Sequence, residues 1–264
     1  MTMVLKAIEQ ALNQLSRAPK VLLLAVSGGP DSQCLLHAMG QIQKQRPELT
    51  LHAVGVDHGL RDGADSELAM AQELARETNI PFIYGTLTTP SSGNLLANAR
   101  QERYRFLREC AKDLGAQAIL TGHTATDQVE TVLLNLSRGA GLQGAGGMSL
   151  FSNGILRPML ELSRPEVMDY VKAHGVPYAT DPSNVNPARA RAQLRKSVIP
   201  ALRDLNPRSD HHFVNFAQTA REAENYINTQ ARQWCDSHRR PAEGLDVASL
   251  ARQHPAMRSA ILRM

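Results

Sequence analysis

Short apolar runs alternate with amphipathic segments through the first half of the chain. Four of the runs have the length of strands, at residues 21–26, 51–56, 81–87 and 116–121. A run that is apolar at successive positions is typical of a parallel strand buried on both faces. Between the runs, apolar residues recur at helical spacing at 65–78 and 96–114. This alternation predicts βαβ units, and therefore an α/β fold with a doubly wound, mostly parallel, Rossmann-like sheet.

The pattern becomes purely helical toward the C-terminus. Residues 1–19 predict an amphipathic helix, and residues 155–160, which contain an Arg-Pro pair, predict a short edge or irregular strand. A Ser-x-x-Glu capping box at 163–166 opens a further helix. Beyond it the helical patterns lie at 187–204, 209–238 and 246–264. We therefore expect a main domain at residues 1–205 and a small, basic, helical domain at residues 206–264.

The composition is that of a globular protein, with 42% hydrophobic and 20% charged residues in a chain of 264. The sequence contains neither the roughly 18 apolar residues of a membrane helix nor a signal peptide, so we expect a cytoplasmic protein without membrane contact. Cys34, Cys110 and Cys235 form no CxxC pair, which is typical of reduced thiols. Residues 187–264 carry 13 Lys and Arg with 7 Asp and Glu, whereas residues 1–186 carry 16 and 18. This imbalance suits a polyanionic partner, although charge alone favours ordinary solvated helix faces.

The loop after the first strand carries the first candidate chemistry. It reads Ser27-Gly28-Gly29-Pro30-Asp31-Ser32 and leads into a helical pattern. Adjacent glycines let the backbone turn its N–H groups toward an oxyanion, and the helix N-terminus adds partial positive charge. The alternative is an ordinary turn capped by Asp31 or Ser32. The loop lacks the lysine of the G-x-x-x-x-G-K-S/T motif, so it is not a Walker A loop.

Polar residues also follow the second and fourth strands. The candidates are Asp57, His58 and Arg61 after the second strand, and Gly122, His123 and Asp127 after the fourth. Parallel strands end at one edge of the sheet, so we expect these residues near the first loop. Arg100 and Arg103 share one helix face. Taken singly, these residues also fit a polar turn, a charge near a helix N-terminus and solvated arginines, and His123 with Asp127 makes no zinc site alone.

Two further segments contain possible site residues. Residues 139–144 match G-x-G-x-x-G but follow a helix rather than a strand, which argues against dinucleotide binding. We expect a flexible glycine loop over or beside the active site. Residues 181–184 read Asp-Pro-Ser-Asn and predict a turn, and arginines crowd the start of the helix expected next.

Taken in order, these motifs resemble those of a known family. The first loop resembles the PP-loop of the N-type ATP pyrophosphatases, which cleave ATP between the α- and β-phosphates. The whole series is similar to the tRNA(Ile)-lysidine synthetase family, with matches at 27–32, 57–61, 99–104, 123–131, 138–144, 181–184 and 191–195. Thr126 stands where the family usually has an acidic residue, and Ala192 where it has asparagine. The amphipathic pattern still runs at Met264, as expected of a truncated chain or a short member.

The resemblance implies an ATP-dependent ligase that joins L-lysine to C2 of the wobble cytidine of tRNA-Ile with a CAU anticodon. An adenylated cytidine would be the intermediate, and AMP and pyrophosphate would be released. The implied partners are ATP, Mg²⁺, L-lysine and the tRNA, and a homodimer is allowed. ATP would be bound by Ser27, Gly28, Gly29, Pro30, Asp31, Ser32, Asp57, His58 and Gly122. Catalysis would fall to Asp31, Arg100, His123 and Asp127, with Mg²⁺ on Asp31. The tRNA or its phosphates would be bound by Arg61, Arg103, Arg138, Asn184, Arg191 and Arg195.

Other functions stay open at this point. A 2-thiocytidine synthesis enzyme shares the PP-loop but normally uses CxxC-held iron–sulfur chemistry, which three isolated cysteines do not support. GMP or NAD synthetases leave the arginine-rich helical third unexplained. A non-catalytic ATP- or RNA-binding relative would lack carboxylate partners, and Thr126 is the one hint in that direction.

Overall fold

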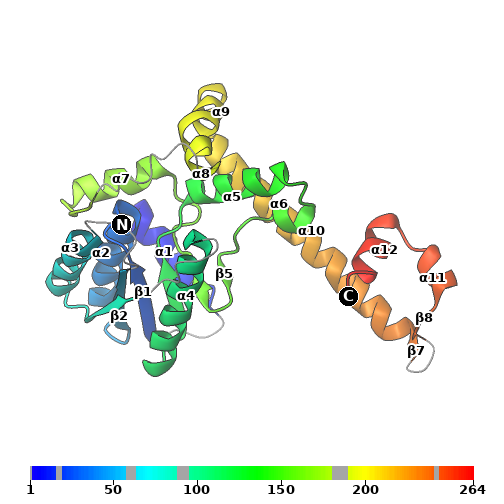
Figure 1. Ribbon diagram of the computed structural model, residues 1–264, viewed down its shortest axis with the longest axis horizontal. Coiled ribbons are helices and arrows are strands. Elements are labelled where there is room, and N and C mark those ends of the chain that lie inside the picture. Colours follow the sequence, from blue (N-terminus) through cyan, green and yellow to red (C-terminus); the bar gives the residue numbers. More distant parts are fainter. Residues whose placement is uncertain (1, 16–19, 58–63, 88–94, 180–189, 241–243) are drawn as a thin grey trace. The chain divides into compact units, whose positions relative to one another are not determined.

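The computed structural model describes residues 2–15, 20–57, 64–87, 95–179, 190–240 and 244–264 (Figure 1). The chain divides into two compact units. The first is Met1–Glu130 with Met148–His211, and the second is Thr131–Gly147 with His212–Met264. The division into domains at residue 205 stays a prediction. The compact units differ from it because residues 131–147 group with the C-terminal residues.

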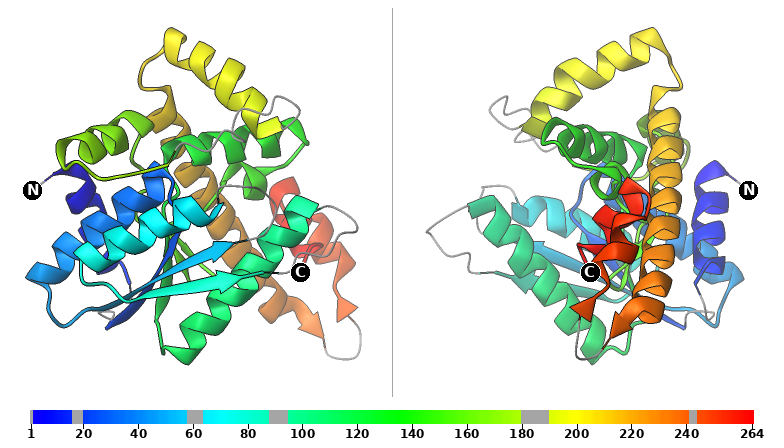
Figure 2. Two further views of the ribbon diagram at one scale, coloured as in Figure 1. Left: turned by 60° about the vertical axis from the view of Figure 1, so that its left-hand side comes forward. Right: turned by 90° about the vertical axis from the view of Figure 1, so that its right-hand side faces the viewer.

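The first unit is built on a six-stranded sheet in the order β3-β2-β1-β4-β6-β5. Neighbouring strands are parallel except for β5, which pairs antiparallel with β6. The side-by-side arrows of β2 and β3 are clearest in the left view of Figure 2. The prediction of a doubly wound, mostly parallel sheet is confirmed. The strands are β1 (Val21–Val26), β2 (Thr50–Asp57), β3 (Phe82–Thr86), β4 (Ala118–Thr121), β5 (Phe151–Ser152) and β6 (Ile155–Leu156).

Side chains of β1 alternate between two hydrophobic cores, one on each face of the sheet. Leu22 and Leu24 join the core under α1, α2, α3 and α7, whereas Leu23 joins the core under α4. All three leucines are 0% exposed, and burying each contributes ~2 kcal/mol. In Figure 1, β1 accordingly lies between α2 and α4. The helices are α1 (Met3–Asn13), α2 (Pro30–Gln45), α3 (Ala64–Glu77), α4 (Leu95–Asp113) and α7 (Arg164–Ala173).

The strand expected at residues 155–160 differs from the one found, in both its length and its place in the sheet. Only Ile155–Leu156 is a strand, and it lies between β4 and β5 rather than at the edge. Asn153 and Gly154 connect β5 to β6 with φ values of 51° and 76°. Two positive φ angles are what a type I′ hairpin turn requires, and Asn-Gly is its usual sequence.

The helical segments also differ from the expected pattern. Residues 139–144 are not a loop throughout, because α6 (Leu142–Ala145) forms one turn there. The segment expected at 187–204 consists, where described, of α8 (Ala190–Gln193), the π-helical turn η2 (Leu194–Val198) and α9 (Ile199–Leu205). The long helix α10 (Ser209–His238) follows, and α5 (Ala125–Ser137) comes earlier, after β4.

The second unit contains a short hairpin and two short helices where helix alone was expected. They are β7 (Arg239–Arg240), β8 (Gly244–Leu245), α11 (Val247–Ala251) and α12 (Pro255–Ile261). The expected continuous helix is divided, because α11 ends at Ala251 and Pro255 opens α12, a helix start being the position where proline is favoured. Trp234 of α10 packs with Ile261 of α12, which lies beside α10 in Figure 1. No helix in the described ranges is long and apolar enough to cross a membrane.

Candidate active site

The sheet places the loops after β1 and β4 side by side. These neighbouring strands are parallel, and Ala25 near the end of β1 is in register with Thr121 at the end of β4. The chain leaves β1 toward β2 and β3 on one side and reaches β4 and β6 on the other, so the strand order reverses here. In open α/β sheets, ligands bind at the carboxyl ends of the strands where the order reverses. The site is therefore expected between Ser27 and His123.

The loop after β1 holds a strained turn that only glycine accommodates. Gly28 has φ of 75°, and a Cβ there would lie 2.5 Å from the carbonyl oxygen of Glu67. The Ser32 hydroxyl donates to the Gly29 carbonyl at 2.9 Å and accepts from the Ser27 N–H at 3.1 Å. Gly29 is the N-cap of α2, so neither Asp31 nor Ser32 caps the helix in the ordinary way. Without a capping side chain from Gly29, the N-terminal turn of α2 suits an anion.

Gly122 brings the tip of β4 against the first turn of α2. A Cβ on Gly122 would lie 2.9 Å from the Asp31 carbonyl carbon and oxygen, and 3.0 Å from the Ser32 nitrogen. All three are backbone atoms, which cannot rotate away as the end of a side chain could. The glycine therefore fixes the approach of His123 to the PP-loop.

Asp31 lies in the first turn of α2 and pairs with Arg164 of α7. Nη1 of Arg164 donates to both Asp31 carboxylate oxygens at 2.5 Å. Burial raises the pKa of Asp31, while the Arg164 charge and hydrogen bond oppose that shift. Asp127 further raises this pKa and Arg195 lowers it, so Asp31 is within electrostatic reach of the groups after β4.

His123 is a neutral group beside arginines. Burial, together with the charges of Arg157, Arg100 and Arg103, lowers the pKa of His123 to about 4, although Asp127 acts in the opposite direction. Nδ1 of His123 and the Thr121 hydroxyl are 2.7 Å apart. At neutral pH the imidazole is thus uncharged and can donate or accept a hydrogen bond.

Carboxylates of α5 form an ion-pair cluster with arginines that follow residue 190. The Glu130 side chain is 0% exposed and is bonded by Nε of Arg195. Nη2 of Arg195 also reaches Asp127 at 3.2 Å, and Arg191 lies 3.9 Å from Glu130. The Asp127 carboxylate accepts a hydrogen bond from the Thr124 N–H at 2.9 Å, so it also satisfies a backbone donor at the start of α5. Burial raises the pKa of Glu130 and the hydrogen bond from Arg195 lowers it.

Arginines of α4 gather around one aromatic ring. The guanidinium carbons of Arg100 and Arg103 lie 5.0 and 5.4 Å from the Tyr104 ring centroid. Arg157 is only 8% exposed and donates to the Ser149 carbonyl at 2.8 Å. Its charge and that of Arg100 both act on His123, so this side of the site is electropositive.

The remaining predicted residues fall in different places. Asp57 ends β2, and its carboxylate lies 3.5 Å from the Tyr84 hydroxyl. Arg138 is exposed and belongs to the second unit. His58, Arg61 and Asn184 lie outside the described residues.

Sequence reasoning did not single out Glu130, Arg164 or Arg157. Arg164 is the first residue of α7, where a positive charge opposes the helix dipole, and that is a signal of a partner elsewhere. Glu130 stands three residues after Asp127 and therefore on the same helix face, another signal available in the sequence. Arg157 carries no such signal.

The carboxylates fit a magnesium ion only in part. Asp31 and Asp127 supply oxygens, the ligands that Mg²⁺ prefers, and they are near enough for Asp127 to raise the pKa of Asp31. No group of three or more acidic, His or Cys residues within the described ranges is arranged to hold a metal ion. The residues therefore suit an ion whose remaining ligands are phosphate oxygens and water.

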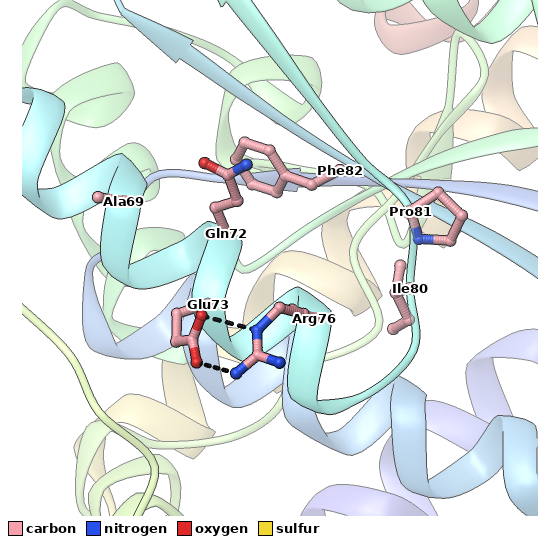
Figure 3. A pocket seen from close by; sticks show the side chains of 7 residues that line it. All are labelled: Ala69, Gln72, Glu73, Arg76, Ile80, Pro81 and Phe82. Atoms are coloured by element: carbon pink, nitrogen blue, oxygen red, sulfur yellow. Dashed lines mark hydrogen bonds and ion pairs between the residues drawn. The ribbon is translucent and has the colours of Figure 1, made fainter.

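A separate surface pocket lies away from this site (Figure 3). Phe82 begins β3, so the pocket is at the amino end of that strand, whereas the PP-loop is at the carboxyl edge. It contains the exposed ion pair of Arg76 with Glu73. Its lining residues are Ala69, Gln72, Glu73, Arg76, Ile80, Pro81 and Phe82.

Comparison with known proteins agrees with this geometry. Residues 2–202 match the PP-loop domain family. A tRNA(Ile)-lysidine synthase of Salinispora tropica is 40% identical over 97% of this chain and 79% of that protein. The one of Streptomyces coelicolor is 36% identical over 94% of this chain and 72% of that protein. A solved U34-tRNA thiolase of Methanococcus maripaludis, which holds a 4Fe-4S cluster, shares the fold over 82% of this chain and 77% of its own, with a TM-score of 0.70 at 17% identity. The chain therefore belongs to the PP-loop proteins and, among them, to the tRNA(Ile)-lysidine synthase family.

Proposed function

We propose that this protein joins L-lysine to C2 of the wobble cytidine of tRNA-Ile with a CAU anticodon, converting ATP to AMP and pyrophosphate. The names of its relatives support this tRNA and this product. The observation that carries the proposal is the position of Asp31. It lies in the first turn of the PP-loop helix and its backbone packs against Gly122, the residue before His123. Asp127 raises the pKa of Asp31 and Arg195 lowers it. The anion cradle and the carboxylate–arginine cluster thus follow neighbouring parallel strands at the same edge of the sheet.

In the first step, the cytidine O2 attacks the α-phosphorus of ATP and pyrophosphate leaves. The loop amides and the N-terminus of α2 bind the departing pyrophosphate, and the Ser27 and Ser32 hydroxyls add hydrogen bonds. Asp31 would hold Mg²⁺, which neutralises charge on the phosphates when it is bound. Arg100 and Arg103 supply further positive charge beside His123. Such phosphoryl chemistry depends mainly on positioning and charge neutralisation.

In the second step, the lysine amine attacks C2, and AMP leaves with the former O2 oxygen. The amine arrives as a cation, and Asp127, whose side chain is 15% exposed, offers it a carboxylate that can accept its proton. Glu130 is buried and bonded by Arg195, so it holds the arginine that contacts Asp127. His123, neutral at pH 7, hydrogen-bonds the adenylated base.

We infer that the arginines bind the RNA. A single-stranded anticodon loop offers splayed bases and phosphates that a protein can contact directly. Arg100 is exposed and stacked on Tyr104, which suits contact with a base or a phosphate. Arg191 and Arg195 pair with Glu130 in the described structure, so their binding to phosphate requires a change of partner.

The rival functions receive less support. Thiolation of the kind that uses a cysteine-held cluster needs neighbouring cysteines, but Cys34 and Cys110 belong to cores on opposite faces of the sheet. A non-catalytic relative has no need for Glu130, a buried carboxylate that is costly to keep charged. The buried carboxylates therefore favour an enzyme.

The test is release of AMP and pyrophosphate from ATP with Mg²⁺, L-lysine and an isoleucine tRNA transcript. Release of AMP should require both lysine and the wobble cytidine, whereas the first pyrophosphate should need the cytidine but not lysine. A transcript with uridine at that position should be inert. Asp31→Asn should lower turnover by about a hundredfold or more while the protein stays folded. Full activity of Asp31→Asn, or AMP release that does not depend on lysine, contradicts the proposal.

A further inference from the structure

We propose that Asp210, acting through Arg203 and Thr126, is a positioning residue for the carboxylates of α5. This inference rests on the proposed function, because it concerns the same site. Thr126 is the neighbour of Asp127 in the first turn of α5, Arg203 lies on α9, and Asp210 lies in the first turn of α10. None of these three side chains is placed in contact with the substrates.

The three side chains form one hydrogen-bonded cluster. Arg203 donates to Asp210 twice, from Nε to Oδ1 at 3.0 Å and from Nη2 to Oδ2 at 2.6 Å. Nη2 of Arg203 also donates to the Thr126 hydroxyl at 3.0 Å, and that hydroxyl donates to Oδ2 of Asp210 at 3.2 Å. The cluster thus connects α5 to α9 and α10, across 84 residues of sequence between Thr126 and Asp210.

Burial indicates that this arrangement is specific. Asp210 is 4% exposed, and removing a carboxylate from water is costly unless it is paired and hydrogen-bonded. A buried ion pair is no general device for stability, since well-packed apolar residues often serve as well or better. The buried pair at the first turn of α5 is better explained by the geometry that it imposes on Thr126.

The geometry holds the first turn of α5 at two points. Arg195 of η2 contacts Asp127 and Glu130, and Arg203 contacts Thr126. Both arginines belong to the helical stretch from residue 190 to residue 205, so α5 is tied to that stretch through its charged residues and through the cluster. A change at Thr126 should therefore displace Asp127 without touching it.

The experiment uses three variants of the full chain. Thr126→Val removes the link to α5 but keeps the pair of Arg203 with Asp210. Asp210→Asn removes the carboxylate, and the double variant Thr126→Asp/Asp210→Asn moves it onto α5, within reach of Arg203. We expect Thr126→Val and Asp210→Asn each to lower kcat between about tenfold and a hundredfold, with the KM for ATP changed little. The double variant should recover most of the lost kcat, which a merely structural role would not produce.

Glu73→Gln, which breaks the exposed pair with Arg76, is the matched control and should keep wild-type kcat. Wild-type kcat in Thr126→Val, or no recovery in a folded double variant, overturns the inference. If Asp210→Asn fails to fold, Thr126→Val still decides it.

Hydrogen exchange separates this inference from the proposed function. Amides in the first turn of α5 should exchange faster in Thr126→Val than in wild type, whether or not the protein makes lysidine. An inactive wild type refutes the proposed function, whereas unchanged exchange at residues 125–130 refutes the cluster's role.

Discussion

Single glycines determine how closely neighbouring segments pack against the first loop and the first turn of α2. Gly28 and Gly122 each face backbone atoms nearer than 3.0 Å to where a Cβ would stand. The sequence predicted the glycine-rich loop and the histidine after β4, because both follow apolar runs. It could not show the pairing of Arg164 with Asp31, since these residues are 133 positions apart and no local pattern joins them.

Replacing Gly28 by alanine should damage both stability and turnover. The positive φ costs a residue with a Cβ ~1–2 kcal/mol, and the contact with Glu67 adds to that cost. We expect a drop of about 2 kcal/mol or more in the free energy of unfolding in urea. Gly29→Ala is the control, because its Cβ would meet only the Ser27 hydroxyl, at 3.9 Å. Equal stabilities of the two variants would contradict the steric argument.

His123 should gain its positive charge at a pH far below the ordinary pKa of a histidine side chain. An unfolded chain protonates this side chain near 6.5, whereas in the native protein burial lowers the pKa to about 4. The unfolded state therefore binds the proton first, and stability falls as pH drops from 6.5 toward 4. The ring C2 proton signal in NMR should show no titration above pH 5. His123→Asn should lose less stability between pH 7.5 and 5 than wild type, and a midpoint near 6.5 would refute this.

At the scale of helices and strands, local signals predicted most elements. The first apolar run coincides with β1, and the capping box of Ser163 with Glu166 opens α7, as the Ser163 amide and hydroxyl both donate to Glu166 at 2.7 Å. The hairpin turn at Asn153 had a sequence signal that the longer apolar pattern obscured. The π-helical turn η2 had no such signal in the sequence, and its Arg195 pairs with Glu130 of α5.

Ser163→Ala should therefore destabilise the fold through the start of α7. Loss of an N-cap hydroxyl lowers the free energy of unfolding by ~1 kcal/mol, measurable in urea. Ser137→Ala at the exposed end of α5 is the matched control and should stay within about 0.5 kcal/mol of wild type. If the two substitutions lower the free energy of unfolding equally, Ser163 does not act as the cap that the structure assigns.

At the scale of the whole molecule, the site is assembled from segments remote in sequence. The PP-loop helix supplies Asp31, the segment after β4 supplies His123 and Asp127, and residues near 195 supply the opposing arginine. The fold class followed from the alternation of strands and helices. The grouping of residues 131–147 with the C-terminal residues did not, because it depends on packing such as the hydrogen bond from Arg221 to the Gly146 carbonyl.

An oxygen label shows directly whether the O2 atom of the wobble cytidine becomes part of AMP, as adenylation of the base requires. An isoleucine tRNA carrying oxygen-18 at O2 of the wobble cytidine is incubated with ATP, Mg²⁺ and L-lysine, and the AMP is analysed by mass spectrometry. We expect one labelled oxygen in each AMP formed and a wobble nucleoside that has gained lysine and lost the label. Unlabelled AMP, with the label kept in the tRNA or released to water, would contradict adenylation of the base.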